Sequence, residues 1–439
     1  MTIINLNFNN DIKSQKLFFG ESLSFARYDK VKYPVLMNLT LKMRSFFWQP
    51  YEIDMSSDKR DFQEMSDQQQ FVFLTVLSRQ IALDSIQQRA PLDIIAKYIS
   101  VPELEPVLIT WSFFEQIHSE SYSHTIKNVL PNADVFFDNL SKDEHIQKCV
   151  KNSSKYYLSL KEEPSKENLL FALFSVNALE AIQFYASFAC SFAFNENKLM
   201  KKNCKLIEMI LRDEQIHQDI TSLLIKLLVK EDDSYKEIIK NNLDKIHKIY
   251  QDVVDMEKDF ARHIFSKGSF MGINEEILCK YIDYVSSRTI RKMGFRDLGF
   301  HKTSLVKEEN FTNPIPFMDN YINQDSKQVA PQEEEKINYK ISSLVNDVSL
   351  EVVQGFNDNI VYSKEDCPYC VKAKKHLIDR GISYKEYIYE KDFTKESLTE
   401  SLKTRFKHLG KDFEVKTVPQ IILEGEYVGG CDDLLKELL

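Results

Sequence analysis

The chain has 439 residues, enough for two domains, and its 57 Lys and Arg against 66 Asp and Glu give a formal net charge of −9. A hydrophobic share of 43% beside 28% charged residues is typical of a globular protein and excludes a disordered one. The acidic balance argues against nucleic-acid binding, because proteins that hold a phosphate backbone generally carry a basic surface.

Glycine is scarce in the first part of the chain. Gly20 is the only glycine before Gly268, and six of the 11 glycines lie between Gly355 and Gly430. Hairpin turns and nucleotide-binding loops depend on glycine for their positive φ angles. We therefore expect long helices in the first 300 residues and a different architecture near the C-terminus.

The cysteines and the N-terminal residues indicate the cellular compartment of the protein. Four cysteines stand singly, Cys367 and Cys370 form a close pair, and Cys431 follows near the end. An odd total without a disulfide framework is typical of a reducing compartment. The first 15 residues lack the basic and apolar regions of a signal peptide, so we expect a cytoplasmic protein.

Helical patterns follow one another through the first part. Ser66 and Gln69 form a capping-box pattern that opens a helix continuing past Asp84 to about Pro91. Further expected helices span about 105–129, 166–194 and 199–229, and amphipathic helices continue to about 296. Long helices joined by short polar connections are typical of a helical bundle.

The segment 168–195 is apolar enough to resemble a membrane span, and Glu180 is its only charged residue. Its flanks lack a clear aromatic and basic belt, and the other helices are amphipathic. A helix that is apolar on all sides can also form the centre of a soluble bundle. We favour the central helix and expect no membrane association.

Two Glu-x-x-His motifs indicate a metal site. They are Glu115 to His118 and Glu214 to His217. Residues three apart lie on one face of a helix, so each motif can offer a carboxylate and an imidazole to one point. Helical bundles that bind two iron or manganese ions use one such motif from each of two helices and one carboxylate from each of two others.

The two further carboxylates are available. Glu180 lies in the middle of the apolar helix, where an ionised carboxylate is costly unless it is paired or metal-bound, and Asp84 lies on the apolar side of an earlier helix. A single Glu-x-x-His motif is usually an exposed helix face, but two motifs with a buried glutamate predict a dinuclear centre. Carboxylates with two imidazoles suit iron or manganese better than zinc.

Tyr122 lies one helical turn after His118 and should therefore lie near the metal centre. Packing in the core is the simpler interpretation, because the chain has 20 tyrosines. Its place beside metal ions that activate oxygen favours oxidation of the phenol. We assign Trp111 to core packing.

The pattern changes near residue 320. We divide the chain into residues 1–320, a helical domain, 321–354, a polar tail or linker, and 355–439, a small α/β domain. In the last part we expect strands at residues 359–363 and 384–389. We expect a helix at 367–379 and a polar helix that ends at about 409. A hairpin is expected at 420–423 and 427–428.

Cys367-Pro-Tyr-Cys370 follows an expected strand and opens an expected helix, a context typical of a redox dithiol. The helix N-terminus and Lys364 should lower the pKa of Cys367, which would then attack a disulfide, while Cys370 resolves the mixed disulfide. A zinc site would need a second pair of cysteine or histidine ligands, and Cys431 alone does not supply one.

Residues 15 to 345 resemble the radical-generating small subunit of class I ribonucleotide reductase. The motifs that carry the resemblance are Phe18-Phe-Gly, Ala26-Arg-Tyr-Asp, Phe46-Phe-Trp48, Asp84-Ser-Ile-Gln, Glu115-x-x-His118-x-x-x-Tyr122, Ser175-Val-Asn-Ala-Leu-Glu180, Arg212-Asp-Glu214-x-x-His217 and Asn313-Pro-Ile-Pro. The resemblance implies an all-α ferritin-like helical bundle, and the small α/β domain that follows would have the thioredoxin fold.

The resemblance also implies roles for the matching residues. One metal ion would be held by Asp84, Glu115 and His118, and the other by Glu180, Glu214 and His217, with Glu115 and Glu214 bridging. Tyr122 would carry a stable radical, protected by a dry pocket of Phe184, Phe188 and Ile210. Trp48 and Asp213 would connect the site to the surface, Asp213 as a partner of His118. Tyr339, which follows Val329-Ala-Pro-Gln, would pass the oxidising equivalent to a separate large subunit.

The last 85 residues resemble glutaredoxin. Besides the dithiol, the resemblance is carried by Thr417-Val-Pro419-Gln-Ile and Gly429-Gly-Cys-Asp432-Asp-Leu. It implies a cis proline facing the dithiol and glutathione as the reductant. The candidate glutathione contacts are Lys364, Thr417, Val418, Pro419, Gly430, Cys431 and Asp432. Cys431 is equally well interpreted as a plain buried cysteine.

These resemblances together predict a reductase of ribonucleoside diphosphates that acts with a large subunit, forms a homodimer and carries its own reductant. The dinuclear metal is expected to be iron, with manganese as the alternative. A di-iron oxygenase or desaturase-like enzyme is the main competing interpretation, and a ferritin-like metal store is the second. Tyr122, Tyr339 and the fused dithiol favour the reductase.

Overall fold

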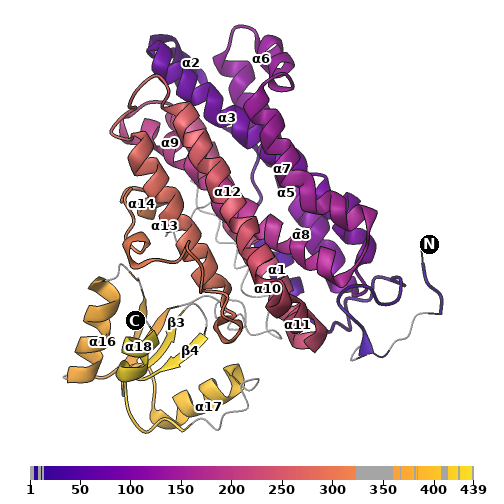
Figure 1. Cartoon of the computed structure of the whole chain (residues 1–439), viewed down its shortest axis with the longest axis vertical. Helices are drawn as coiled ribbons and strands as arrows, with labels where there is room; N and C mark the ends of the chain where they lie inside the picture. The colour runs from indigo at the N-terminus through magenta and orange to yellow at the C-terminus, as the bar shows by residue number, and fades with distance from the viewer. Residues whose placement is uncertain are drawn as a thin grey trace.

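The computed structural model describes residues 4–7, 11, 14–322, 359–365, 367–379, 382, 384–406, 414–423 and 426–437. Within these ranges the chain forms a helical part that ends at Ile322 and a part with a sheet that begins at Asn359 (Figure 1). The expected order of a helical bundle and a small α/β domain is therefore confirmed.

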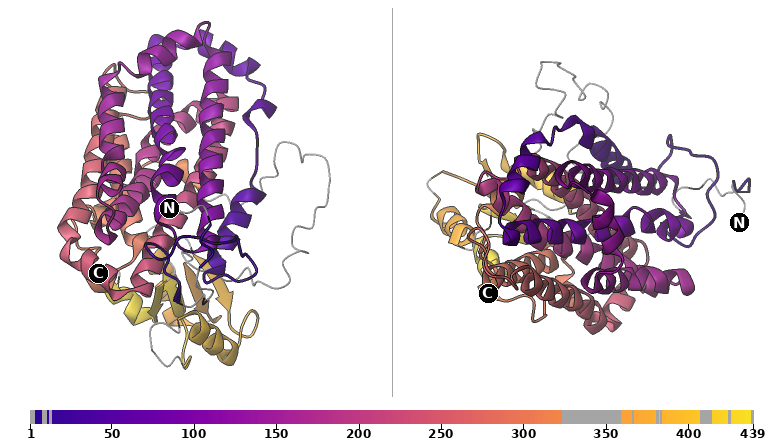
Figure 2. Two further views of the ribbon diagram at one scale, coloured as in Figure 1. Left: turned by 90° about the vertical axis from the view of Figure 1, so that its right-hand side faces the viewer. Right: turned by 90° about the horizontal axis from the view of Figure 1, so that it is seen from above.

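The helical part consists mainly of long helices. They are α1 (Pro34–Ser45), α2 (Ser56–Glu64), α3 (Asp67–Gln87), α4 (Ala90–Asp93), α5 (Glu105–Val129), α6 (Ala133–Leu140), α7 (Glu144–Glu162), α8 (Lys166–Ala178), α9 (Phe184–Glu196), α10 (Lys201–Glu231), α11 (Asp233–Asn241), α12 (Leu243–Ile264), α13 (Glu275–Met293) and α14 (Met318–Ile322). Figure 2 shows the long helices lying side by side. Helix α3 packs against α5, α7 and α9, and α10 packs against α8 and α9.

Local sequence sets several of these helix boundaries. The predicted capping box is confirmed: Gln69 N–H donates to Ser66 Oγ at 3.3 Å, and Ser66 N–H donates to Gln69 Oε1 at 2.9 Å. Asp143 caps α7 in a similar way by accepting from the His145 backbone N–H at 2.8 Å. Such caps satisfy backbone donors that a helix start otherwise leaves unpaired.

The apolar segment lies in the core of the bundle. The most apolar 18-residue window of its helical run, Lys166–Glu196, is 94% buried, as expected for the central helix rather than a membrane span. The predicted regular helix is wrong in one respect, because α8 and α9 are joined by a π-helical turn, η5 (Leu179–Gln183). A uniformly apolar segment shows no periodicity, so its sequence could not reveal the wider turn.

The C-terminal part is built on a four-stranded sheet. Its elements are β1 (Ile360–Ser363), α16 (Pro368–Asp379), β2 (Lys385–Ile388), α17 (Lys395–Arg405), β3 (Gln420–Leu423), β4 (Glu426–Gly429) and α18 (Cys431–Glu437). The strand order is β2-β1-β3-β4, with β1 parallel to β2 and antiparallel to β3. Val361 packs with Ala373 and Leu377 of α16, whereas the neighbouring Ile360 packs with Leu398 of α17. The sheet is therefore covered on both faces.

A buried ion pair connects α3 to α12. The guanidinium of Arg79 donates to Glu257 Oε1, and the two side chains are 3% and 0% exposed. The same guanidinium lies 5.0 Å from the centre of the Phe260 ring. Neither charged group is exposed to solvent, so each depends on the other to compensate its charge.

We predict that Glu257→Gln lowers the free energy of unfolding of the helical part by about 3–5 kcal/mol, because it leaves the Arg79 charge buried without a counter-ion. Urea titration followed by the helical circular dichroism signal measures the change. The matched control is Glu276→Gln, which breaks the exposed pair with Lys280 and should leave the urea midpoint unchanged. Equal effects of the two substitutions would contradict the prediction.

Candidate metal centre and dithiol

Four helical segments bring the predicted metal ligands together in the core. The ligands are Asp84 from α3, Glu115 and His118 from α5, Glu180 from η5, and Glu214 and His217 from α10, all buried. They form two overlapping groups, each with its ligand atoms within 4.8 Å of one another. The groups share Glu115 and Glu214, so these two glutamates lie between the two possible metal positions.

The two imidazoles face the shared glutamates. His118 Nδ1 lies 3.0 Å from Glu214 Oε1 and 3.5 Å from Glu115 Oε2. His217 Nδ1 lies 3.0 Å from Glu115 Oε1 and 2.8 Å from Glu214 Oε2. Each histidine can therefore share an ion with both glutamates, which is the arrangement that two bridging carboxylates require.

The donor atoms fit a pair of divalent cations. Several buried ligand atoms have no hydrogen-bond partner, namely both carboxylate oxygens of Asp84, Oε2 of Glu115, Nδ1 of His118, Oε2 of Glu180 and Oε1 of Glu214. Buried polar atoms without partners are costly in a protein core, but a metal ion would satisfy them. Carboxylate oxygens with two imidazole nitrogens match the preferences of iron and manganese.

The ionisation of the cluster also reflects its burial. Burial raises the pKa values of Asp84 and Glu180 well above the usual range, and the charges of Glu115 and Glu214 raise them further. Burial alone would lower the pKa of His118, but the charge of Glu214 and the hydrogen bond to Asp213 raise it overall. Four carboxylates cannot all be charged here without cations, so the cluster needs either protons or metal ions.

A chain of contacts leads outward from His118. Its Nε2 lies 3.3 Å from Asp213 Oδ2, and Trp48 Nε1 donates to the same oxygen at 2.8 Å. Arg212 donates to the other oxygen of Asp213 at 3.2 Å. Trp48 is 2% exposed. The structure thus places Trp48 and Asp213 next to each other and next to a ligand, as the sequence resemblance implied.

Two further residues contact the ligands directly, and the sequence analysis missed both roles. Trp111 is more than core packing: its Nε1 donates to Glu115 Oε1 at 2.8 Å, and its ring stacks on His217 with the centroids 5.0 Å apart. Its position four residues before Glu115 on α5 was the available signal. The other residue is Gln87, whose side-chain N–H donates to Glu180. No sequence spacing indicated this contact.

Tyr122 lies on α5 one turn from His118 and is 1% exposed. Burial raises the pKa of its phenol well above the usual value, and the charge of Asp84 raises it further. The phenol is therefore neutral in the resting protein. Phe184, Phe188 and Ile210 are fully buried, and the Phe184 and Phe188 rings stack with centroids 5.5 Å apart.

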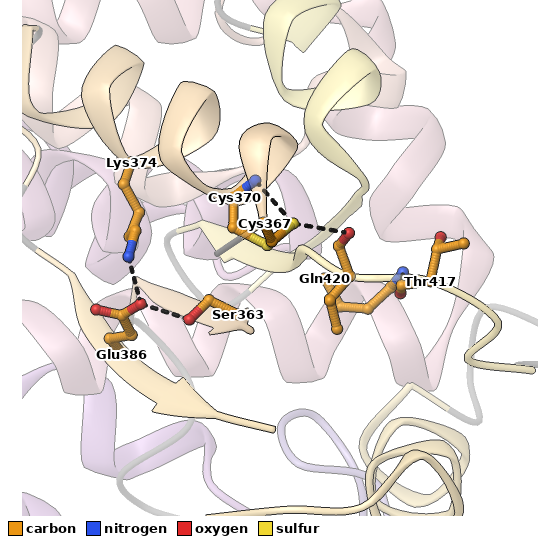
Figure 3. Close-up of a disulfide and its surroundings, with 8 residues drawn as sticks. Ser363, Cys367, Cys370, Lys374, Glu386, Thr417 and Gln420 are labelled. Atoms are coloured by element: carbon orange, nitrogen blue, oxygen red, sulfur yellow. Dashed lines mark hydrogen bonds and ion pairs between the residues drawn. A yellow bond between two sulfur atoms is a disulfide. The ribbon is translucent and has the colours of Figure 1, made fainter. Parts of the chain in front are cut away.

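The predicted dithiol lies at the start of α16. Cys367 and Cys370 form a disulfide with their Cα atoms 5.2 Å apart (Figure 3). Cys367 is half-buried, whereas Cys370 is fully buried. The Cys370 backbone N–H donates to Cys367 Sγ at 3.2 Å. Such a donor favours a thiolate, so Cys367 is the better placed of the two sulfurs to react with a partner.

The loop before β3 lies beside the dithiol. Cys367 Sγ lies 3.8 Å from the Val418 carbonyl oxygen, and the Val418–Pro419 peptide bond is cis. Thr417 in the same loop is exposed. The structure therefore places two of the predicted glutathione contacts, Val418 and Pro419, in the loop that faces the reactive sulfur.

The other predicted glutathione contacts differ in exposure and in hydrogen bonding. Lys364 and Asp432 are exposed. The Gly430 backbone N–H already donates to Asp433 Oδ2 at 3.0 Å. Cys431 is 4% exposed, and burial raises the pKa of its thiol. That environment favours a plain buried cysteine over a reactive one. Tyr339 lies outside the described residues.

Comparisons with known proteins agree with both sites. The sequence of residues 26–304 matches the family described as ribonucleotide reductase, small chain, and residues 359–428 match the glutaredoxin family. The matches leave the predicted boundaries at 320 and 354 untested.

Individual relatives cover most of the chain. Ribonucleoside-diphosphate reductase 1 subunit beta of Escherichia coli O157:H7 is 37% identical over 373 residues, which are 79% of this chain and 97% of the relative. The subunit beta of Enterobacteria phage T4 is 32% identical over 390 residues, which are 81% and 98%. The solved R2 subunit from Clostridium botulinum has a TM-score of 0.65 at 23% identity and covers 73% of this chain and 98% of that one.

The structural likeness confirms the expected ferritin-like bundle, and the two sequence matches include the candidate metal ligands and the dithiol. The chain therefore belongs to the ribonucleotide reductase small chain family and carries a C-terminal glutaredoxin domain.

Proposed function

We propose that this chain is the radical-generating small subunit of a class I ribonucleoside-diphosphate reductase and works with a separate large subunit in the cytoplasm. The proposal depends above all on one observation: two overlapping ligand groups share Glu115 and Glu214, and Tyr122 lies one helical turn from His118. Relatives that share at least 32% identity over nearly their whole length are named as subunits of this enzyme.

In this proposal Asp84, Glu115 and His118 hold one metal ion, and Glu180, Glu214 and His217 hold the other. The ligands suit iron, and manganese accepts the same donors. When bound, the metal pair would supply the oxygen-dependent oxidation that removes an electron from the Tyr122 phenol. The chain's own contribution is to keep the phenol neutral and buried beside the ligands.

The surroundings of Tyr122 are suited to a long-lived radical. We propose that Phe184, Phe188 and Ile210, which are fully buried and apolar, line a dry pocket around the phenol and keep water and reductants from it. We propose that the oxidising equivalent leaves the core through Trp48, which Asp213 connects to His118 by hydrogen bonds. Tyr339 would carry it onward to the large subunit, which reduces the ribonucleotide.

An exposed apolar face supports homodimer formation. Leu41, Phe47, Tyr51, Ile109 and Phe113 are each 44–64% exposed, and they lie on or next to α1 and α5, which pack together. The Phe47 and Phe113 rings stack with their centroids 6.0 Å apart. An apolar patch of this kind marks an interaction surface, and we propose that a second copy of the chain covers it.

The glutaredoxin domain would supply the reducing equivalents. We propose residues 355–439 as this domain and 321–354 as the connection to the helical domain, 1–320. The Cys367 thiolate attacks a disulfide of the large subunit, Cys370 displaces the reduced cysteine, and two glutathione molecules restore the dithiol as glutathione disulfide forms. Each cycle thus moves two electrons and two protons to the large subunit. The half-buried Cys367 sulfur supports this order of attack.

We predict that wild-type protein treated with Fe²⁺ and oxygen shows a tyrosyl EPR signal and that Tyr122→Phe lacks it while both proteins bind two iron ions per chain. The matched control is Tyr250→Phe on α12, where another fully buried tyrosine donates to Asn177 at 2.8 Å. The control should keep the signal. An unchanged signal in Tyr122→Phe would refute the assignment and would leave the oxygenase alternative open.

A second prediction separates the two redox sites. In Cys367→Ser, turnover with the large subunit and glutathione should fall to background because no thiolate remains to attack the disulfide. Turnover with dithiothreitol and the tyrosyl signal should both be unchanged. Cys279→Ser, which changes a free cysteine on α13 of the helical part, serves as the control and should retain glutathione-supported turnover. Full glutathione-supported turnover in Cys367→Ser would contradict the proposed role of the fused domain.

A further inference from the structure

Glu180 differs from the other ligands because it lies in the π-helical turn η5. One of its oxygens, Oε1, accepts a hydrogen bond from the Gln87 side chain on α3, and the other, Oε2, has no hydrogen-bond partner. The orientation of the carboxylate therefore depends on Gln87. A π turn at a ligand makes such an external partner important, because the regular hydrogen bonds of the helix are interrupted there.

Chemistry fixes the direction of the Gln87 amide. A carboxylate that binds a metal ion is ionised and can only accept hydrogen bonds, so the amide nitrogen of Gln87 must face Glu180 when the centre is loaded. The amide oxygen then faces the opposite way, where it accepts from the Tyr157 hydroxyl at 2.8 Å. Glu180 and Gln87 are 0% exposed and Tyr157 is 3% exposed, so both bonds are shielded from bulk solvent.

Tyr157 belongs to α7, which contributes no ligand to the cluster. One turn earlier on the same helix, the Ser153 hydroxyl donates to Gln183 Oε1 at 3.2 Å, and Gln183 is the last residue of η5. Helix α7 therefore touches the π turn directly at Gln183 and, through Gln87, at Glu180. These two contacts connect α7 to the wider turn.

We propose that Tyr157 is a positioning residue of the metal centre. It holds the Gln87 amide so that the amide N–H donates to Glu180 Oε1, and Glu180 Oε2 is then left to bind the ion that Glu180 shares with His217. The inference rests on the proposed dinuclear centre. Trp111 acts on Glu115 in the same manner, since it donates to Oε1 and leaves Oε2 without a partner. A donor on one oxygen of each glutamate limits the ways in which the carboxylate can bind metal.

The proposal predicts which ion is affected. Removing the Tyr157 hydroxyl leaves the Gln87 amide free to turn, and Glu180 then loses its donor. The position formed with His217 should weaken about 10- to 100-fold, as is usual when a residue that orients a ligand is lost. The position of Asp84 and His118 should keep its affinity, because the hydrogen bonds of the Gln87 side chain go to Glu180 and Tyr157 and none joins it to Asp84 or His118 in the described residues.

The test is a titration of the metal-free full chain with Mn²⁺, followed by EPR. Wild type should bind two ions per chain with a signal of coupled ions. Tyr157→Phe should bind one ion tightly and show the six-line signal of an isolated Mn²⁺ until the second, weaker position fills. The matched control is Tyr156→Phe, the same change one residue away, where the half-buried ring packs on Phe171. It should behave as wild type.

A double-substitution cycle shows whether Tyr157 acts through Gln87. Gln87→Ala should weaken the same ion at least as much as Tyr157→Phe, and adding Tyr157→Phe to Gln87→Ala should cause no further loss. Thermal unfolding of the metal-free variants checks that each retains the fold. Additive losses, or two tight ions in Tyr157→Phe, would overturn the proposal. Fewer than two ions in wild type would instead overturn the dinuclear centre on which it rests.

Discussion

The structure depends on four carboxyl groups placed in an apolar core. Asp84, Glu115, Glu180 and Glu214 are all 0% exposed, and no lysine or arginine ammonium or guanidinium is among their partners in the described residues. Burying such charges costs several kcal/mol each unless cations or protons compensate them. Two divalent cations provide four positive charges, which balance the carboxylates. The helices that carry these residues must therefore meet at one place, and the bundle is arranged around that meeting point.

The bundle also supplies the partners that orient the ligands. Aromatic side chains donate directly to Glu115 and to Asp213, and Tyr157 acts on Glu180 through Gln87. Rings are rigid, so their donors are held in position by packing alone. This arrangement leaves some carboxylate oxygens free to bind metal while it fixes the others by hydrogen bonds.

The dithiol lies in a more exposed place than the metal ligands. Cys367 must reach a partner protein, and it lies half-buried at the start of a helix.

Much of this organisation was predictable from the sequence because helices impose a fixed spacing. Residues 105–129 were expected to be helical, and α5 spans Glu105–Val129. The two Glu-x-x-His motifs and the buried Glu180 led to the six residues that meet in the core. The strands and helices around the Cys367 pair were also expected, within a few residues.

What the sequence did not reveal comes from contacts between helices and from irregular backbone. The bonds from Gln87 to Glu180 and from Tyr157 to Gln87 join residues 93 and 70 positions apart, and such pairs have no periodic pattern. The π turn occurs in an apolar segment where every helical face looks alike. Helix α7 was not singled out, although its residues hold that turn.

The central claim is that the core holds a pair of redox metal ions that oxidise Tyr122. The most direct measurement is metal analysis combined with EPR on one sample of the full chain purified from its native host. The account predicts two iron or manganese ions per chain and a tyrosyl signal in that sample. A sample with zinc, with a single ion or without a tyrosyl signal at full metal content would contradict it.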